Sequence, residues 1–184
     1  MNSNFTIKNF RAFNNVGADI EIRPITILTG CNSSGKSSFV KALLLLNELF
    51  RKNDSDNVLK NSKLDFTSET LSMLGDFSTI HNDEASQLGE DIEISYDAVS
   101  SILLGNYNVT LSFGPTQNDR LNNGCLKDVV VKDSEGNVIW GIRHNKSDKG
   151  ISVLNRVCGR SYLTAEYGFG NLIDFIINIE YRAD

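Results

Sequence analysis

The chain has 184 residues, of which 40% are hydrophobic and 22% are charged, and its formal net charge is -5 at pH 7. This length fits about one domain, and the composition is that of an ordinary globular protein with a hydrophobic core. An acidic chain excludes nucleic-acid binding through overall positive charge, so any such contact would need a local basic patch.

Neither a membrane anchor nor a disulfide framework is expected. The longest apolar run, around Phe39 to Leu46, is far shorter than the roughly 20 residues that a membrane-spanning helix needs. The first ten residues lack the basic and apolar regions of a signal peptide. Cys31, Cys125 and Cys158 are widely separated and form no CxxC pair. We therefore expect a cytoplasmic protein with reduced cysteines and no zinc site.

The first predicted elements are two short strands. Phe5 and Ile7 alternate with polar residues, which is typical of a half-buried strand, and Ile20 and Ile22 repeat the pattern after the turn at NNVG. The two strands are expected to pair as a hairpin. The next run, ITILT (residues 25–29), is apolar or β-branched throughout, which predicts a strand covered on both faces.

A helix is predicted from Lys36. Apolar residues between positions 39 and 50 occupy almost its whole circumference, which indicates a helix wrapped by protein. The polar run RKNDSDN (residues 51–57) is expected to end it in a solvated loop. Between residues 59 and 87 the pattern is weak and is compatible with one or two short strands and a turn at Gly75.

The remaining sequence predicts mostly β-structure. Strand-like runs separated by turn residues are DIEISYDA (91–98), NYNVTLSFG (106–114), CLKDVVVKD (125–133), NVIWGIRHN (137–145) and GISVLNRV (150–157). DSEGN (133–137) is a predicted hairpin loop, Trp140 is expected in the core, and a helix is predicted to start at Asn171. The fold class expected is α/β or α+β, with a mixed sheet beside the first helix and antiparallel strands as a second layer.

The residues between the ITILT run and the helix form a phosphate-binding motif. GCNSSGKS (residues 30–37) matches G-x-x-x-x-G-K-[ST] at every fixed position, between a predicted strand and a predicted helix. Glycine lets backbone amides converge on one anion, and the helix start adds unpaired amides and the positive end of its dipole. The residues expected to hold the phosphates are Gly30, Asn32, Ser33, Ser34, Gly35, Lys36, Ser37 and Ser38. The weaker alternative is a glycine-rich turn that only joins strand to helix.

Individual roles follow from side-chain chemistry. Lys36 is the predicted catalytic residue because its ammonium group can reach the β- and γ-phosphates. The Ser37 hydroxyl is the predicted ligand of a Mg²⁺ that keeps most of its waters. Two interpretations are open for Arg11, a contact to the nucleotide or a solvated charge, and we favour the second. His81 is expected to be structural or exposed, because no cysteine or carboxylate is paired with it at a catalytic spacing.

The stretch FTIKNFRAFNNVGADIEIRPITILTGCNSSGKSSFVKALLLL (residues 5–46) resembles the N-terminus of the ABC-type ATPase heads of SMC and RecF-like proteins. Within that group it is most similar to bacterial predicted AAA-type ATPases related to overcoming-lysogenization-defect nucleases. LSMLGDFSTIHND (residues 71–83) is similar to the segment that follows the first helix in those ATPases. The resemblance implies a P-loop NTPase fold with an ABC-ATPase-like mixed sheet and an antiparallel β-subdomain. It also implies ATP with Mg²⁺, head-to-head dimerisation, a role in DNA transactions or phage defence with DNA or a nuclease as partner, and His81 near the Q-loop position.

In such heads a C-terminal lobe supplies a signature motif, an apolar strand ending in Asp-Glu and a switch histidine. We find none of these in the sequence, since the run FIINIE (residues 175–180) ends in an acid but has Asn178 and Ile179 before it. We therefore interpret residues 1–184 as a single N-terminal lobe whose C-terminal lobe is absent. In this interpretation residues 1–58 hold the strands, P-loop and Walker A helix, and residues 59–184 form a β-rich remainder with a C-terminal helix.

Three functions remain open from the sequence. The first is an ATP-binding P-loop protein that hydrolyses ATP only with its missing lobe or a partner, because phosphoryl transfer needs a Walker B acid and a group that orients water. The second is a non-catalytic nucleotide-binding interaction module. The third, a P-loop kinase for a small substrate, is weaker because the strand-rich stretch from Ile92 to Val153 lacks strand–helix alternation.

Overall fold

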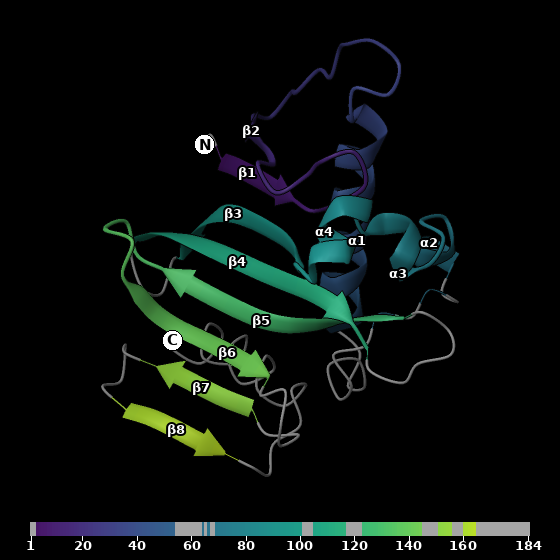
Figure 1. The fold of residues 1–184 in the computed structure, drawn as a ribbon. Helices are drawn as coiled ribbons and strands as arrows, with labels where there is room; N and C mark the ends of the chain where they lie inside the picture. The colour runs from purple at the N-terminus through teal and green to yellow at the C-terminus, as the bar shows by residue number, and fades with distance from the viewer. Residues whose placement is uncertain are drawn as a thin grey trace.

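The computed structural model describes residues 3–53, 64, 66, 69–100, 105–116, 123–144, 151–155 and 160–164. The strands in this part are β1 (Ser3–Lys8), β2 (Ala18–Ile22), β3 (Ile92–Ser100), β4 (Gly105–Pro115), β5 (Gly124–Lys132), β6 (Val138–His144), β7 (Ile151–Asn155) and β8 (Arg160–Thr164). The helices are α1 (Lys36–Asn53), α2 (Glu69–Ser72), α3 (Phe77–Ile80) and α4 (Asp83–Leu88). Figure 1 shows one twisted sheet with α1 beside it and the three short helices grouped around α1.

The eight strands form a single sheet in the order β2-β1-β3-β4-β5-β6-β7-β8. All seven neighbouring pairs are antiparallel. The α+β alternative therefore describes this part of the chain, whereas the mixed sheet and the separate second layer are wrong for it. The reason is that β1 lies between β2 and β3, so the N-terminal hairpin and the later strands join one sheet.

The predicted N-terminal hairpin is confirmed. β1 and β2 pair antiparallel with Phe5 opposite Ile20, and Phe5 and Ile7 are buried. β2 lies at the edge of the sheet, where Ile20 and Ile22 are half-buried against the core. The alternation of apolar and polar residues was sufficient here because one face of each strand meets the core and the other meets solvent.

The core lies between the sheet and α1. Helix residues Phe39, Ala42, Leu45, Leu46 and Leu49 are buried together with sheet residues Ile92, Ile94, Leu111, Phe113 and Leu126. The Phe39 ring meets the Phe5 ring edge-on, with centroids 5.6 Å apart. Val40, however, is 48% exposed, so the prediction of a helix wrapped on nearly all sides is wrong at Val40. The helix also continues through Asn53 rather than ending at Arg51, and residues 54–57 of the predicted loop lie outside the described residues.

Residues 69–88 form short helices where one or two strands were predicted. Asp76 caps α3 and Asn82 caps α4, each with a side-chain oxygen that accepts a hydrogen bond from a backbone amide three residues on. Gly75 has φ 95°, in agreement with the predicted turn. The strand prediction is wrong here because these caps stabilise single helical turns, and such turns are too short to show a period in the sequence.

Removing the cap of α3 is expected to destabilise the fold. The Asp76 carboxylate accepts hydrogen bonds from the Ser78 hydroxyl at 2.7 Å and from the Thr79 amide and hydroxyl at 2.8 Å. These bonds hold the pKa of Asp76 below its usual value. Asp76→Ala should lower the free energy of unfolding by about 1 kcal/mol at pH 7, measured by urea denaturation.

The pH dependence supplies the control. Because the folded pKa is lowered, the carboxylate stabilises the fold above its unfolded pKa of about 3.9, and this stabilisation is lost as the pH falls through the folded pKa. The difference between wild type and Asp76→Asn should therefore shrink as the pH falls below about 4. Equal stability of wild type and Asp76→Ala at pH 7 would contradict the proposed cap.

The β-rich part agrees with the sequence prediction for β3 to β7. In the 133–137 loop the Gly136 amide donates to the Asp133 carbonyl and the Asp133 amide donates to the Asn137 carbonyl, both at 3.0 Å, which closes the β5–β6 hairpin as expected. Trp140 is 8% exposed and belongs to the core. Strand β8 was not predicted, and the predicted helix from Asn171 lies outside the described residues.

Candidate functional site

The segment that leads from β2 into the motif is not a strand. Residues 25–30 share no backbone–backbone hydrogen bond with any other described residue. Ile25 and Ile27 are 83% and 80% exposed, whereas Leu28 packs against the core. The prediction of a strand covered on both faces is therefore wrong, because no described strand lies next to this segment. Figure 1 shows the chain after β2 arching away from the sheet before it enters α1.

The motif loop needs glycine at both of its fixed positions. Gly30 and Gly35 have φ 149° and 91°, in the region that L side chains rarely adopt, and Ser33 between them has φ 65°. A Cβ on Gly35 would lie 2.8 Å from two ring carbons of Phe13. A Cβ on Gly30 would lie 2.9 Å from the Ser34 hydroxyl. The loop therefore curls tightly enough at these two places that a larger residue would distort it.

Helix α1 begins directly after this loop and presents free backbone donors. The first amide with an acceptor is that of Phe39, which donates to the Gly35 carbonyl at 2.9 Å. Within the described residues no acceptor is found for the amides of Lys36, Ser37 and Ser38. Unpaired amides at a helix start, together with the positive end of the helix dipole, favour a bound anion.

The Lys36 ammonium group lies over the loop itself. Its Nζ donates to the carbonyl oxygens of Gly30, at 2.8 Å, and Cys31, and lies 3.3 Å from the Ser34 hydroxyl. The positive charge is therefore placed above the curled backbone. To reach a phosphate oxygen, the ammonium group must exchange these carbonyl acceptors for the new one.

A cavity of about 470 Å³ lies between this loop and two other segments. Its lining consists of Arg11, Ala12, Ser33, Gly35, Ser37, Ser38, Thr79, His81, Asn82 and Asp83. Of the residues predicted to hold phosphate, Ser33, Gly35, Ser37 and Ser38 border the cavity, whereas Gly30, Asn32, Ser34 and Lys36 do not. The structure thus brings half of the predicted set to one cavity and adds residues from outside the motif.

Arg11 is one of these additional residues. It has φ 50°, which is unusual for arginine. Its amide donates to the Ile80 carbonyl, and its own carbonyl accepts from the Asn82 side chain, both at 2.8 Å. The contacts to residues 79–82 place Arg11 at the border of the cavity, and its guanidinium group is exposed, 3.5 Å from the Thr79 carbonyl oxygen. The favoured interpretation of Arg11 as a solvated charge stays a prediction. A non-glycine residue kept at positive φ is often found where a ligand binds.

His81 also borders the cavity, and its ring is fixed. It is 7% exposed, and its ring centroid lies 5.3 Å from that of Phe77. Its Nε2 lies 2.7 Å from the Glu90 carbonyl oxygen. Because a carbonyl can only accept, Nε2 carries the proton, and in the neutral ring Nδ1 is the acceptor. The expectation of a structural histidine is confirmed by these contacts.

The segment from Thr79 to Asp83 could not be assigned to the site by residue chemistry alone. The signal in the sequence was the resemblance of residues 71–83 to a segment of predicted ATPases, and the end of that segment lines the same cavity as the loop. In the described ranges no group of three or more His, Cys, Asp or Glu residues could hold a metal ion. No helix built from these residues is long and apolar enough to cross a membrane.

The arrangement offers hydroxyls, free amides, one guanidinium group and one carboxylate around a polar cavity, which suits a bound anion. A family model described as AAA ATPase domain matches residues 1–154. The matched range contains the motif loop, Arg11 and the segment 79–83. No curated protein and no solved structure gives a match.

Proposed function

Because the chain belongs to the AAA ATPase domain family, we propose that it binds ATP as the magnesium complex in this cavity. The observation that carries the proposal is the lining, which combines motif residues with Arg11. A polyphosphate placed there would lie close to the start of α1, with its unpaired amides, and to Arg11. Charge-assisted hydrogen bonds of this kind are roughly twice as strong as neutral ones.

The motif residues then take the roles expected from their chemistry. Gly30 and Gly35 allow the loop to curl, and Asn32, Ser33, Ser34 and Ser38 complete the loop around the phosphates. Lys36 is the proposed catalytic residue, moving from the Gly30 and Cys31 carbonyls to the β- and γ-phosphate oxygens. Its positive charge would stabilise the negative charge that develops there during phosphoryl transfer.

The donor set also fits Mg²⁺. Ser37 supplies a hydroxyl that borders the cavity, and the nucleotide would add phosphate oxygens. Mg²⁺ is usually held by one or two protein oxygens together with substrate phosphates and waters. When bound, the ion neutralises part of the charge on the β- and γ-phosphates. We therefore propose Ser37 as a ligand of the ion.

The finer proposal is that the chain forms one lobe of an SMC/RecF-like ATPase head in the cytoplasm. The resemblance of residues 5–46 and 71–83 supports a role in DNA transactions or phage defence, with DNA or a nuclease as partner. The exposure of Ile25 and Ile27 supports the idea that more protein covers this segment, either a C-terminal lobe or a second copy in a homodimer. The Walker B acid and the water-orienting group would come from that covering protein.

The second candidate is a nucleotide-binding interaction module without hydrolysis. It is favoured by the same exposed isoleucines, because a nucleotide bound to the loop that follows them would fix a surface for a partner. The two proposals differ in one property. An ATPase lobe turns over ATP once the covering protein is present, whereas an interaction module binds ATP and releases it unchanged.

Binding of Mg-ATP to the chain tests the shared part of both proposals. Isothermal titration with ATP, ADP and AMP should show binding of ATP and ADP and at least about tenfold weaker binding of AMP, because the loop holds the β-phosphate that AMP lacks. AMP bound as tightly as ATP would place recognition on the nucleoside and contradict the proposed loop contacts. Absence of any binding would contradict the function itself.

A further inference from the structure

Asp83 is the only acid among the described residues that line the cavity. It begins α4, and the fold fixes its position through its neighbour Asn82. The Asn82 amide donates to the Asn9 carbonyl at 2.9 Å, and the Asn82 side chain donates to the Arg11 carbonyl at 2.8 Å. The start of α4 is thereby tied to the turn after β1. These contacts hold the exposed residue Asp83 at the border of the cavity that Ser37 also lines.

We propose that Asp83 supplies a protein carboxylate for the Mg²⁺ of the bound nucleotide, in addition to the Walker B acid of the covering protein, directly or through one of the waters on the ion. The inference rests on the proposed function, because phosphate oxygens must complete the coordination. Ser37 and Asp83 then approach the ion from different segments, 46 residues apart in the chain. Mg²⁺ prefers this combination of carboxylate, hydroxyl, phosphate and water oxygens.

The structure also explains why the ion would not bind on its own. Among the described residues no three metal-binding side chains of the His, Cys, Asp and Glu types come together. One carboxylate and one hydroxyl make too few ligands for a hydrated Mg²⁺ ion. The site therefore accepts the ion as part of the metal–nucleotide complex, and titration of the protein with Mg²⁺ or Mn²⁺ alone should show no saturable binding at the cavity.

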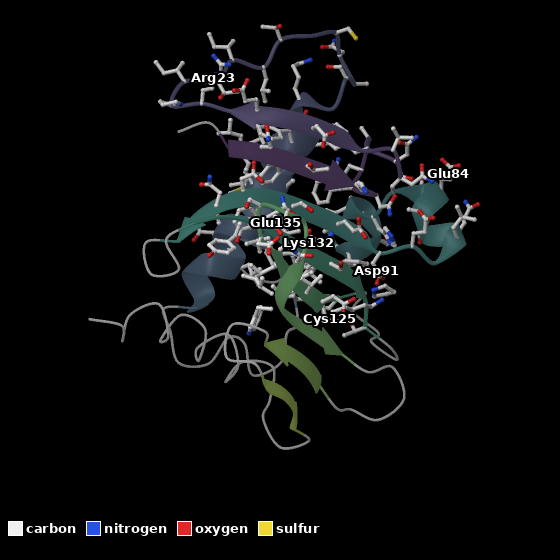
Figure 2. All side chains as sticks on the ribbon, turned by 90° about the vertical axis from the view of Figure 1, so that its left-hand side faces the viewer. Arg23, Glu84, Asp91, Cys125, Lys132 and Glu135 are labelled. Carbon is white, nitrogen blue, oxygen red and sulfur yellow. The ribbon has the colours of Figure 1, made fainter. Side chains whose placement is uncertain are left out.

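Asp83 has a second role that the experiment must separate from metal binding. Acids in the first turn of a helix are stabilised by the helix dipole, and both Asp83 and Glu84 lie in the first turn of α4. Glu84 does not border the cavity, and Figure 2 shows it on α4 at the surface. Glu84→Gln removes the same charge from the same turn and is the matched control for Asp83→Asn.

The experiment measures ATP affinity by titration calorimetry with saturating Mg²⁺ and again with EDTA. For Asp83→Asn we expect the affinity with Mg²⁺ to fall about tenfold. In EDTA the affinity should stay the same or rise, because a negative charge near the bare triphosphate has been removed. Glu84→Gln should leave both affinities unchanged, and Asp83→Glu, which keeps the carboxylate, should retain most of the gain due to Mg²⁺.

Three outcomes would overturn the proposal. An Asp83→Asn protein with the wild-type ratio of affinities in Mg²⁺ and EDTA would show that the carboxylate does not face the ion. An equal loss of affinity in both conditions, shared by Asp83→Glu, would show that Asp83 only supports the structure of α4. Wild-type protein that binds no ATP in either condition would contradict the proposed function itself. If the wild type binds ATP normally and Asp83→Asn has the same ratio of ATP affinities in Mg²⁺ and EDTA as the wild type, only this inference is wrong.

Discussion

Replacing Lys36 by alanine is expected to weaken Mg-ATP binding about 100-fold, which corresponds to about 2.8 kcal/mol. At ~4 Å and an effective dielectric of ~20, an ammonium group and one phosphate charge attract by about 4 kcal/mol. Part of this attraction is offset, because the ammonium group first gives up the carbonyls of Gly30 and Cys31. Titration calorimetry of wild type and Lys36→Ala with ATP in saturating Mg²⁺ measures the net loss of binding free energy.

A matched control separates the local charge from the total charge. Lys41 lies on the same helix and is half-buried, but it is four residues past the end of the GCNSSGKS loop, whereas the Lys36 ammonium group donates to carbonyls of that loop. Lys41→Ala should therefore bind Mg-ATP with wild-type affinity, and both variants should melt near the wild-type temperature. If Lys36→Ala kept full affinity while remaining folded, the GCNSSGKS loop would not be the phosphate site.

The sequence predicted those parts of the fold that depend on local patterns. The alternation in β1 and β2, and again in β3 to β7, reports on one buried face and requires no knowledge of the neighbouring strand. The GCNSSGKS loop is set by two glycines whose positive φ is required within the loop itself. Local chemistry was also sufficient for the closed loop at residues 133–137.

Other features depend on neighbours that the local sequence does not reveal. The run ITILT is typical of a buried strand, but such a strand needs a neighbouring strand to pair with. The described residues provide no such neighbour for it. The sequence left the place of Arg11 open, because the contacts that hold it come from Ile80 and Asn82, about 70 positions away.

The motif also predicts a large effect at Gly35. Gly35→Ala should lower the free energy of unfolding by about 2–4 kcal/mol, because it combines backbone strain with overpacking. The strain arises from φ 91°, and the overpacking arises because the new Cβ would lie 2.8 Å from the Phe13 ring. The loop must shift to relieve both, so its amides leave their positions and Mg-ATP binding should be lost. Urea denaturation and titration calorimetry measure the two effects.

Two further variants separate the backbone strain at positive φ from the steric overlap with the Phe13 ring. Gly136 has φ 85°, and a Cβ there would meet nothing within 4 Å. Gly136→Ala should therefore cost only about 1 kcal/mol and leave binding intact. In Gly35→Ala/Phe13→Leu the smaller side chain should restore part of the stability, while binding stays weak because the backbone at position 35 is still strained. If Gly35→Ala cost no more than Gly136→Ala and bound Mg-ATP normally, the contact with Phe13 would not determine the shape of the loop.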